Sequence, residues 1–354
     1  MRRTLPVTSD TAGWEHERMD AVDALDEIAF WLERELAPTF KVKAFRTAAA
    51  IIAPLTRDEL ADRVADGRLT RTKGIGDRTF QVISQAVVGA VPDYLADLRA
   101  KNSEPLDPGG ADLLAQLRGD LHAHTDWSDG TTPIAVMAAA AATLGREYQA
   151  ITDHSPNLTV ANGLSPERLA EQLEAIAGLD TGPVTLLTGI EVDILEDGTL
   201  DQEPALLDRL DVVVASVHSK LRSDRRTMTA RMLGGVRDPR TNVLGHCTGR
   251  LVQGSRGTRP PSEFDAEAVF AACAQNDVAV EINSRPERQD PPDDLIRLAL
   301  DAGCVFSIDT DAHAPGQLDF LSYGAARAAA NGVPAERIVT TWPLDRLREW
   351  LAKG

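Results

Sequence analysis

Short apolar runs alternate with longer amphipathic stretches from residue 118 onward. The apolar runs are mostly rich in Val, Ile or Leu and occupy residues 119–123, 148–152, 184–190, 211–217, 242–245, 278–282 and 305–308. The stretches between them repeat apolar residues at helical spacing, as in residues 134–144, 166–176, 266–273 and 294–302. Strands that alternate with helices predict βαβ units and a parallel sheet covered on both faces. We therefore expect an α/β fold, a seven-stranded βα barrel, with an open doubly wound sheet as the alternative.

Histidine and acidic residues follow these apolar runs. Six of the seven histidines do so, and the full set is His122, His124, Asp129, His154, Glu191, His218, His246, Asp311 and His313. The side chains that follow the strands of a βα barrel gather at its C-terminal mouth, where active sites are built. Imidazole and carboxylate together bind Zn, Mn and Fe without a thiolate. Nine such groups exceed the needs of one four-coordinate ion and predict a polynuclear metal site rather than scattered histidines.

The segments that carry these residues resemble the PHP domain, a family named after polymerase and histidinol phosphatase. They are residues 120–124, 128–130, 152–155, 189–191, 216–219, 245–250, 281–283 and 310–313. The match covers roughly residues 119–345, and every expected ligand position is filled. Order and spacing are most similar to the C-terminal PHP domain of bacterial family X DNA polymerases. The resemblance implies a distorted (β/α)7 barrel with a trinuclear metal site.

The resemblance also implies how the ligands divide among three ions, expected to be Mn²⁺ with Zn²⁺ or Fe²⁺ as alternatives. The expected groups are His122, His124, Glu191 and Asp311 for one ion, Glu191, His218 and His246 for a second, and Asp129, His154 and His313 for the third. Metal ions activate water near neutral pH and stabilise charge on phosphoryl oxygens. With a metal-bridging hydroxide as nucleophile, Glu191, Asp129 and His218 are the expected catalytic residues.

Other polar residues near the strand ends have two interpretations each. Asp153 could orient a metal-bound imidazole or cap a helix N-terminus. Arg250 and Arg288 could bind substrate phosphate in bidentate fashion or form surface salt bridges. Asn283 ends the sixth strand and is a candidate substrate-binding residue. Asp309 lies two residues before a ligand, on the same side of an extended segment, where it could support that ligand or cap the strand.

The first hundred residues predict a different, helical unit. Apolar residues at helical spacing run through 22–36 and stop before Pro38, and a glycine-containing turn in 69–78 precedes a further helix at 79–88. This pattern resembles the small N-terminal domain of family X polymerases, whose helix-hairpin-helix binds DNA backbone phosphate. The DNA-binding candidates are Lys41, Lys43, Arg46, Lys73, Gly74, Gly76 and Arg78. The alternative is that the glycines only end helices and the basic residues form an ordinary solvated face.

The resemblance has two departures. Animal members carry the lysine of a lyase reaction where this sequence has Val82, which puts lyase activity in doubt. Family X polymerases also place palm and fingers between the two domains. Here the expected order is a helical domain at residues 20–98, a linker at 99–118 and the barrel at 119–354, so polymerase activity is not expected.

Composition restricts the partners. The formal net charge is −17, which argues against general nucleic-acid binding, so DNA contact must come from local basic patches. The three cysteines show no paired metal-ligand spacing. Residues 1–10 lack an apolar core segment, and no apolar run is long enough to span a bilayer. We therefore expect a soluble, cytoplasmic protein that does not bind membranes.

The expected function is hydrolysis of DNA phosphodiesters, as a 3′-5′ exonuclease or a repair end-processing nuclease. The first alternative is a small-molecule phosphomonoesterase of the histidinol phosphatase type. The helix-hairpin-helix pattern argues against that alternative, because a metabolite enzyme has no evident use for a DNA-binding hairpin. A regulatory DNA-binding module is the non-enzymatic alternative, and the intact ligand set argues against it.

Overall fold

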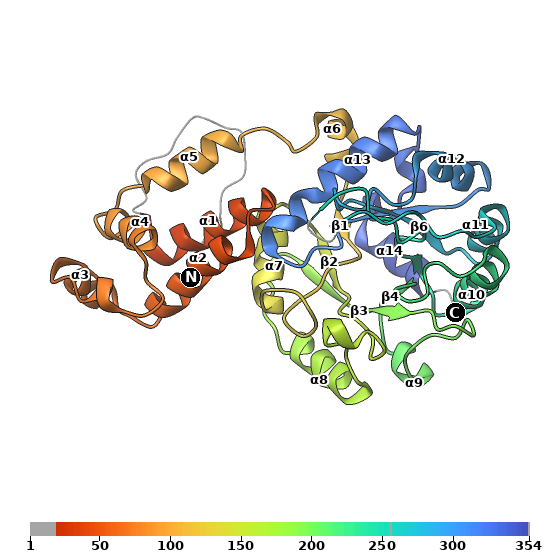
Figure 1. Cartoon of the computed structure of the whole chain (residues 1–354), viewed down its shortest axis with the longest axis horizontal. Coiled ribbons are helices and arrows are strands. Elements are labelled where there is room, and N and C mark those ends of the chain that lie inside the picture. Colours follow the sequence, from red (N-terminus) through yellow and green to blue (C-terminus); the bar gives the residue numbers. More distant parts are fainter. Residues whose placement is uncertain (1–18, 255–256, 353–354) are drawn as a thin grey trace. The chain divides into compact units, whose positions relative to one another are not determined.

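The computed structural model describes residues 19–254 and 257–352 and divides into two compact units, Met1–Pro105 and Leu106–Gly354 (Figure 1). In the second unit, seven strands form one parallel sheet in sequence order. They are β1 (Gly119–Asp120), β2 (Tyr148–Ile151), β3 (Thr185–Asp193), β4 (Val212–Ser216), β5 (Val243–Leu244), β6 (Ala279–Asn283) and β7 (Phe306–Asp309). A parallel bridge between Ala123 and Ala312 joins the residues after β1 and β7. The sheet is therefore a nearly closed barrel, and the predicted α/β barrel is confirmed.

Helices surround the strands of this unit (Figure 1). The longer ones are α7 (Ile134–Thr143), α8 (Pro166–Ala177), α10 (Arg225–Arg237), α11 (Ala266–Gln275), α12 (Asp293–Asp301), α13 (Leu321–Ala330) and α14 (Leu344–Leu351), with short helices α6 (Ala111–Leu114) and α9 (Pro204–Leu207). Local chemistry fixes their starts, as at α8, where the Ser165 hydroxyl accepts from the amide of Arg168 and Pro166 holds the first helical position. Four of these helices match the predicted stretches to within two residues at either end.

Alternation along the strands divides the core into an inner and an outer layer. Val212 and Val214 of β4 pack inside the barrel with residues such as Tyr148, whereas Val213 and Ala215 pack against the outer helices. Because both faces are covered, every residue of β4 is buried. The continuous apolar runs in the sequence predicted strands covered on both faces, and β4 is such a strand.

The first unit is a bundle of helices with its own apolar core. Its elements are α1 (Ala21–Arg34), α2 (Thr39–Ile52), α3 (Arg57–Ala65), the 3-10 helix η1 (Leu69–Arg71), α4 (Asp77–Val87) and α5 (Asp93–Lys101). The element before the glycine turn is this 3-10 turn rather than an α-helix, because only six residues separate Gly67 and Gly74, both at positive φ. Val82 is buried in the core of this bundle.

The residues between the two predicted domains are structured. Helix α5 extends to Lys101, and the 3-10 helix η2 (Pro108–Gly110) and α6 belong to the second unit. A Cβ atom at Gly110 would lie 2.3 Å from the backbone nitrogen of Ala326, so glycine permits this close approach to α13.

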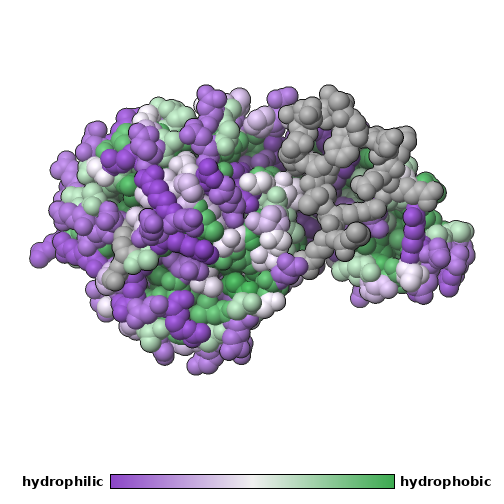
Figure 2. Space-filling model, turned by 180° about the vertical axis from the view of Figure 1, so that it is seen from behind, coloured by the Kyte–Doolittle hydropathy of each residue, from purple (hydrophilic) through white to green (hydrophobic). Residues whose placement is uncertain are grey.

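Figure 2 shows hydrophilic side chains over much of the surface of the second unit, with smaller hydrophobic areas between them. Among the described residues, no helix combines the length and apolar character needed to cross a membrane.

Candidate metal centre

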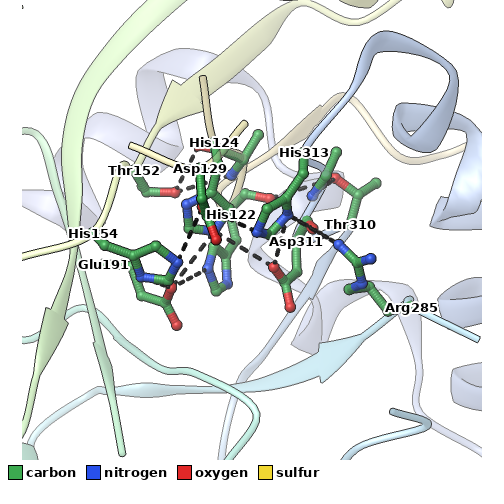
Figure 3. Close-up of polar contacts among 12 residues, drawn as sticks. His122, His124, Asp129, Thr152, His154, Glu191, Arg285, Thr310, Asp311 and His313 are labelled. Atoms are coloured by element: carbon green, nitrogen blue, oxygen red, sulfur yellow. Dashed lines mark hydrogen bonds and ion pairs between the residues drawn. The ribbon is translucent and has the colours of Figure 1, made fainter. Parts of the chain in front are cut away.

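Glu191 contacts more imidazoles than any other carboxylate of the histidine cluster, and Figure 3 shows it beside His154. Side chains alternate between the two faces of a strand, so Glu191 shares the inward face of β3 with Leu187, four residues earlier. Its carboxylate therefore points into the barrel. The distances from its two oxygens to the nearest imidazole nitrogens are 3.3 Å to His122, 3.5 Å to His124, 2.9 Å to His154, 3.1 Å to His218 and 2.8 Å to His246. One buried carboxylate therefore faces five imidazoles that follow four different strands.

A second carboxylate, Asp129, gathers the remaining part of the cluster. Its Oδ1 atom lies 3.4 Å from Nε2 of His154 and 3.3 Å from Nε2 of His313. Asp311 Oδ1 lies 3.4 Å from Nε2 of His124 and 3.5 Å from Nδ1 of His313. The structure thus brings all nine predicted ligands together at the end of the barrel where the strands finish.

Acceptors on the far side of three rings fix their orientation. His122 Nδ1 lies 2.6 Å from Glu281 Oε1, and His218 Nδ1 is hydrogen-bonded to Asp193. His313 Nδ1 lies 2.9 Å from the backbone oxygen of Asp311. For His122 and His218, a proton held on Nδ1 by the carboxylate leaves the Nε2 lone pair for a metal ion, whereas Nδ1 of His313 also lies 2.9 Å from the donor Nη1 of Arg285. Sequence reasoning did not assign these roles to Glu281 and Asp193, because only the lateral packing of strands places each beside its histidine.

The backbone of Asp311 contributes to the same arrangement. Its φ is +52°, in the left-handed region that non-glycine residues seldom adopt. This conformation accompanies the contact of its carbonyl oxygen with His313 and of its carboxylate with His124. Strained backbone of this kind concentrates at functional sites, where the surrounding structure must hold it.

Burial and mutual charge perturb the titration of the cluster. Burial raises the pKa of Glu191, but the imidazoles around it, above all His218 and His122, hold that pKa well below its ordinary value. Burial lowers the pKa of His154, yet Glu191 and Asp129 raise it to about 10. Burial, His313 and His154 lower the pKa of His124 to about 3. In the absence of cations, some imidazoles hold protons while others stay neutral.

The donor set fits metal ions. Several buried ring nitrogens and both oxygens of Glu191 have no hydrogen-bond partner within the described ranges, among them Nε2 of His122, His124, His218 and His246. Buried polar atoms without partners are costly in a folded protein, and a shared cation would satisfy them. Three groups have ligand atoms close enough to share an ion: His124, Asp129, His154 and His313; His122, His124 and Glu191; and His154, Glu191 and His218. These groups overlap those that the family resemblance implies without coinciding with them.

Asp153 has a structural role that differs from both interpretations made from the sequence. Its carboxylate accepts hydrogen bonds from the amide and hydroxyl of Thr125, at 2.8 and 2.6 Å, and from the Ser128 hydroxyl at 2.5 Å. It also accepts from Nε2 of Gln172 in α8, at 2.6 Å. It therefore ties the loop that carries Asp129 to helix α8, and it neither orients a ring nor caps a helix.

The arginines predicted from the sequence are engaged by the protein itself. The Arg250 guanidinium donates to the backbone oxygens of Arg288 and Gln289, which disfavours its predicted contact with phosphate. Arg288 is buried, and its Nε donates to Asp311 Oδ2 at 2.9 Å. Asn283 Nδ2 also donates to this oxygen, at 3.1 Å. Arg288 and Asn283 thus hold a candidate metal ligand.

Asp309 accepts a hydrogen bond from the Leu121 amide, at 2.8 Å, and so joins the ends of β7 and β1.

Arg46, a predicted DNA contact in the helical unit, is paired with Glu33 at 3.0 Å and Asp26 at 2.9 Å. Because these pairs occupy its guanidinium, a phosphate contact by Arg46 is disfavoured. Lys41, Lys43, Lys73 and Arg78 are exposed.

Arg285 was not predicted from the sequence, yet it lies beside the cluster (Figure 3). Its Nη1 donates to the backbone oxygen of Asp311 at 2.8 Å and lies 2.9 Å from Nδ1 of His313. It lines a cavity of about 430 Å³ that opens onto Asp129, His154 and His313. Its position two residues after Asn283 at the end of β6 was the available signal, because strand ends in such a barrel face the site.

Comparison of the sequence with known proteins places this chain in a family. Residues 120–285 match the PHP domain family. The chain is 34% identical over 243 residues to the DNA polymerase/3′-5′ exonuclease PolX of Bacillus subtilis, an alignment that spans 68% of this chain and only 42% of that protein. It is 30% identical over 205 residues to a protein of Photobacterium profundum named a probable phosphatase, covering 55% of this chain and 77% of that protein.

Two further matches have lower identity. The chain is 27% identical over 245 residues to the probable phosphatase YcdX of Escherichia coli, covering 66% of this chain and 94% of that protein. The structure of a histidinol phosphate phosphatase from Lactococcus lactis, in complex with zinc, L-histidinol and phosphate, superposes with a TM-score of 0.45 at 18% identity. That superposition covers 61% of this chain and 94% of the other.

Proposed function

This chain belongs to the PHP domain family and is a metal-dependent phosphoesterase, and from that premise we propose that it hydrolyses phosphodiester bonds of DNA. The observation that carries phosphoester hydrolysis is the cluster of six histidines with Asp129, Glu191 and Asp311, part of which lines an accessible cavity. The names of its relatives, a DNA polymerase/3′-5′ exonuclease and several probable phosphatases, support phosphoester chemistry. The exposed basic residues of the helical unit favour DNA as the substrate.

Three ions, with Mn²⁺ expected and Zn²⁺ or Fe²⁺ as alternatives, would be held by the nine ligands. Bound ions would supply an activated water molecule and neutralise charge on the phosphoryl oxygens. The protein groups supply the geometry. His154 contacts both Glu191 and Asp129, His218 contacts Glu191, and Arg288 keeps the Asp311 carboxylate in place.

The second candidate is a phosphomonoesterase that acts on small molecules. It is favoured by the probable phosphatases, because the alignments cover most of their length, whereas the polymerase is matched over less than half of its own. It gives no role to the exposed lysines of the helical unit. The two candidates share the metal centre and differ in what binds outside it.

Product analysis separates these candidates. The protein, stripped of metal and reconstituted with Mn²⁺ or Zn²⁺, would be incubated with end-labelled single- and double-stranded DNA and with a panel of small phosphate monoesters. We expect stepwise shortening of DNA from the 3′ end and slow turnover of the small esters. Turnover of small esters with intact DNA would move the assignment to the phosphomonoesterase, and no hydrolysis of either with full metal loading would refute both.

A further inference from the structure

The ligands implied for the third ion line the cavity. This outer group consists of Asp129, His154 and His313, whose ligand atoms lie close enough to share an ion. The side chains of Asp129 and His313 are 37% and 22% exposed. Those of His122 and Glu191, which could share another ion, are at most 1% exposed. An ion in the outer group would therefore lie nearer to solvent than an ion held by the buried ligands.

Arg285 contacts the outer group through His313. Its Nη1 lies 2.9 Å from Nδ1 of that ring, whereas Nε2 of the same ring lies 3.3 Å from Asp129 Oδ1. A guanidinium has only hydrogen-bond donors, so Nδ1 must be the acceptor at this contact. A neutral imidazole that accepts at Nδ1 carries its proton on Nε2. The contact thus favours the tautomer of His313 that cannot bind a metal ion through Nε2.

This environment sets His313 apart from His122 and His218. In those two rings Nδ1 faces a carboxylate, which accepts a proton from Nδ1 and leaves Nε2 free. An acceptor is also in place for His313, because the backbone oxygen of Asp311 lies 2.9 Å from its Nδ1. The metal-binding tautomer of His313 therefore needs only that Arg285 release Nδ1.

Glu287 offers Arg285 another partner. Its Oε1 lies 3.6 Å from Nη2 of Arg285, which is longer than a charge-assisted hydrogen bond. Its Oε2 has no hydrogen-bond partner among residues 19–254 and 257–352. Both side chains line the same cavity. A small rotation of the guanidinium would exchange the ring nitrogen of His313 for a carboxylate.

We infer that Arg285 and a metal ion compete for His313. The guanidinium lies on His313 when the outer group is empty and moves to Glu287 when an ion is bound. The outer ion is therefore the weakest bound of the three and exchanges with free metal, while the buried ions stay in place. The inference rests on the three-ion centre of the proposed function and adds to it a residue that sets the occupancy of one ion.

The tautomer of His313 tests this competition without metal or substrate. Long-range proton–nitrogen NMR correlations show which imidazole nitrogen carries the proton, and a His313→Gln sample identifies the signals of this ring. In the metal-free wild-type protein we expect the proton on Nε2. In Arg285→Ala it should move to Nδ1, where the Asp311 oxygen accepts it.

Metal binding tests the consequence. Equilibrium dialysis against buffered Zn²⁺, with metal content measured by mass spectrometry, gives the affinity of each successive ion. Arg285→Ala should bind the third ion about tenfold or more tightly than the wild-type protein, because neither the competing hydrogen bond nor the nearby positive charge remains. Glu287→Gln should weaken the third ion, and the double variant should lie close to Arg285→Ala, since Glu287 acts through Arg285. Arg237→Ala removes an exposed arginine at the end of α10 and should change nothing.

Three results would overturn the inference: a proton on Nδ1 of His313 in the metal-free wild-type protein, equal third-ion affinity in Arg285→Ala and the wild-type protein, or equal affinity of the wild-type protein for all three ions. The first is measured on the wild-type fold, so it decides the matter even if Arg285→Ala does not fold. Failure of the proposed function would appear differently, as no phosphoester hydrolysis by the fully loaded wild-type protein, and would leave these measurements unaffected.

Discussion

Glu191 contributes one negative charge to five surrounding imidazoles, so its charge matters more than its shape. Glu191→Gln keeps the size of the side chain and removes that charge. We expect metal content below that of the wild-type protein and loss of hydrolysis by about 10³-fold or more, comparable to removal of a major electrostatic contributor to catalysis. The fold should remain, because the barrel core lies below the site.

Inductively coupled plasma mass spectrometry and circular dichroism on the same sample check this prediction. Asp301→Asn changes an exposed carboxylate in α12 and serves as the control. Full metal loading with unchanged turnover in Glu191→Gln would contradict the assignment of Glu191 as a bridging ligand.

His154 makes metal binding dependent on pH. In the metal-free protein Glu191 and Asp129 raise its pKa to about 10, so it holds a proton at neutral pH. The protonated ring stabilises the metal-free fold fully below its unfolded-state pKa of about 6.5, and this contribution is lost as pH rises through about 10. A metal ion must displace that proton, so metal affinity should fall as pH is lowered.

Calorimetric titration of metal at pH 7.5 in two buffers of different ionisation enthalpy should therefore show net proton release. His154→Asn should reduce the number of protons released by about one. Proton release unchanged by the substitution, or metal affinity flat down to about pH 5, would contradict a metal site built on His154.

The individual ligands were predictable from the sequence, whereas their surroundings were not. A ligand such as His218 directly follows an apolar strand, and strand order alone brings it to the mouth of the barrel. Asp193 and Glu281 lie within strands, and their roles depend on which neighbouring ring each faces. Arg250 and Arg46 were predicted to contact anions, but backbone carbonyls occupy the guanidinium of Arg250 and carboxylates occupy that of Arg46. A sequence pattern does not show which guanidinium groups the protein itself already engages.

At the scale of elements, loops are attached to helices by buried polar anchors. Asp153 ties the loop that precedes α7 to α8 through four accepted hydrogen bonds. Asp153→Ala leaves these donors buried and unpaired, and we expect a loss of about 3 kcal/mol in the free energy of unfolding. Metal content should also fall, because Asp129 lies in the same loop.

Urea unfolding followed by far-ultraviolet circular dichroism measures this loss. Asp301→Ala, which removes an exposed carboxylate, should change stability by less than about 0.5 kcal/mol. Equal stability of the two variants would show that the anchor is not needed.

The same scale shows why the barrel was easier to predict than the helical unit. Strand and helix periods alternate clearly after residue 118, because each strand is covered on both faces. In the first unit the hairpin depends on Gly74 at φ +98°, whose Cβ would lie 2.7 Å from Ile51 Cδ1. A pattern of glycines indicates such a turn, but the positive φ of Gly67, which limits η1 to a short 3-10 turn, is not evident from the sequence alone.

At the scale of the whole molecule, the question is whether the helical unit brings DNA to the metal centre. Lys73 and Arg78 flank the glycine turn and are exposed, although Arg78 also lies 5.2 Å from the ring centre of Tyr94. If both contact phosphate, Lys73→Ala with Arg78→Ala should weaken DNA binding. The slope of log affinity against log salt should then fall by about 2, because each lost contact no longer releases a counterion. Hydrolysis of a small chromogenic phosphate ester should stay unchanged, since the metal ligands are untouched.

The matched control is Arg209→Ala with Arg237→Ala, two exposed arginines of the barrel. Fluorescence anisotropy of labelled DNA between low and physiological salt compares the two pairs, and equal losses would mean that the overall charge of −17, not the hairpin, governs binding.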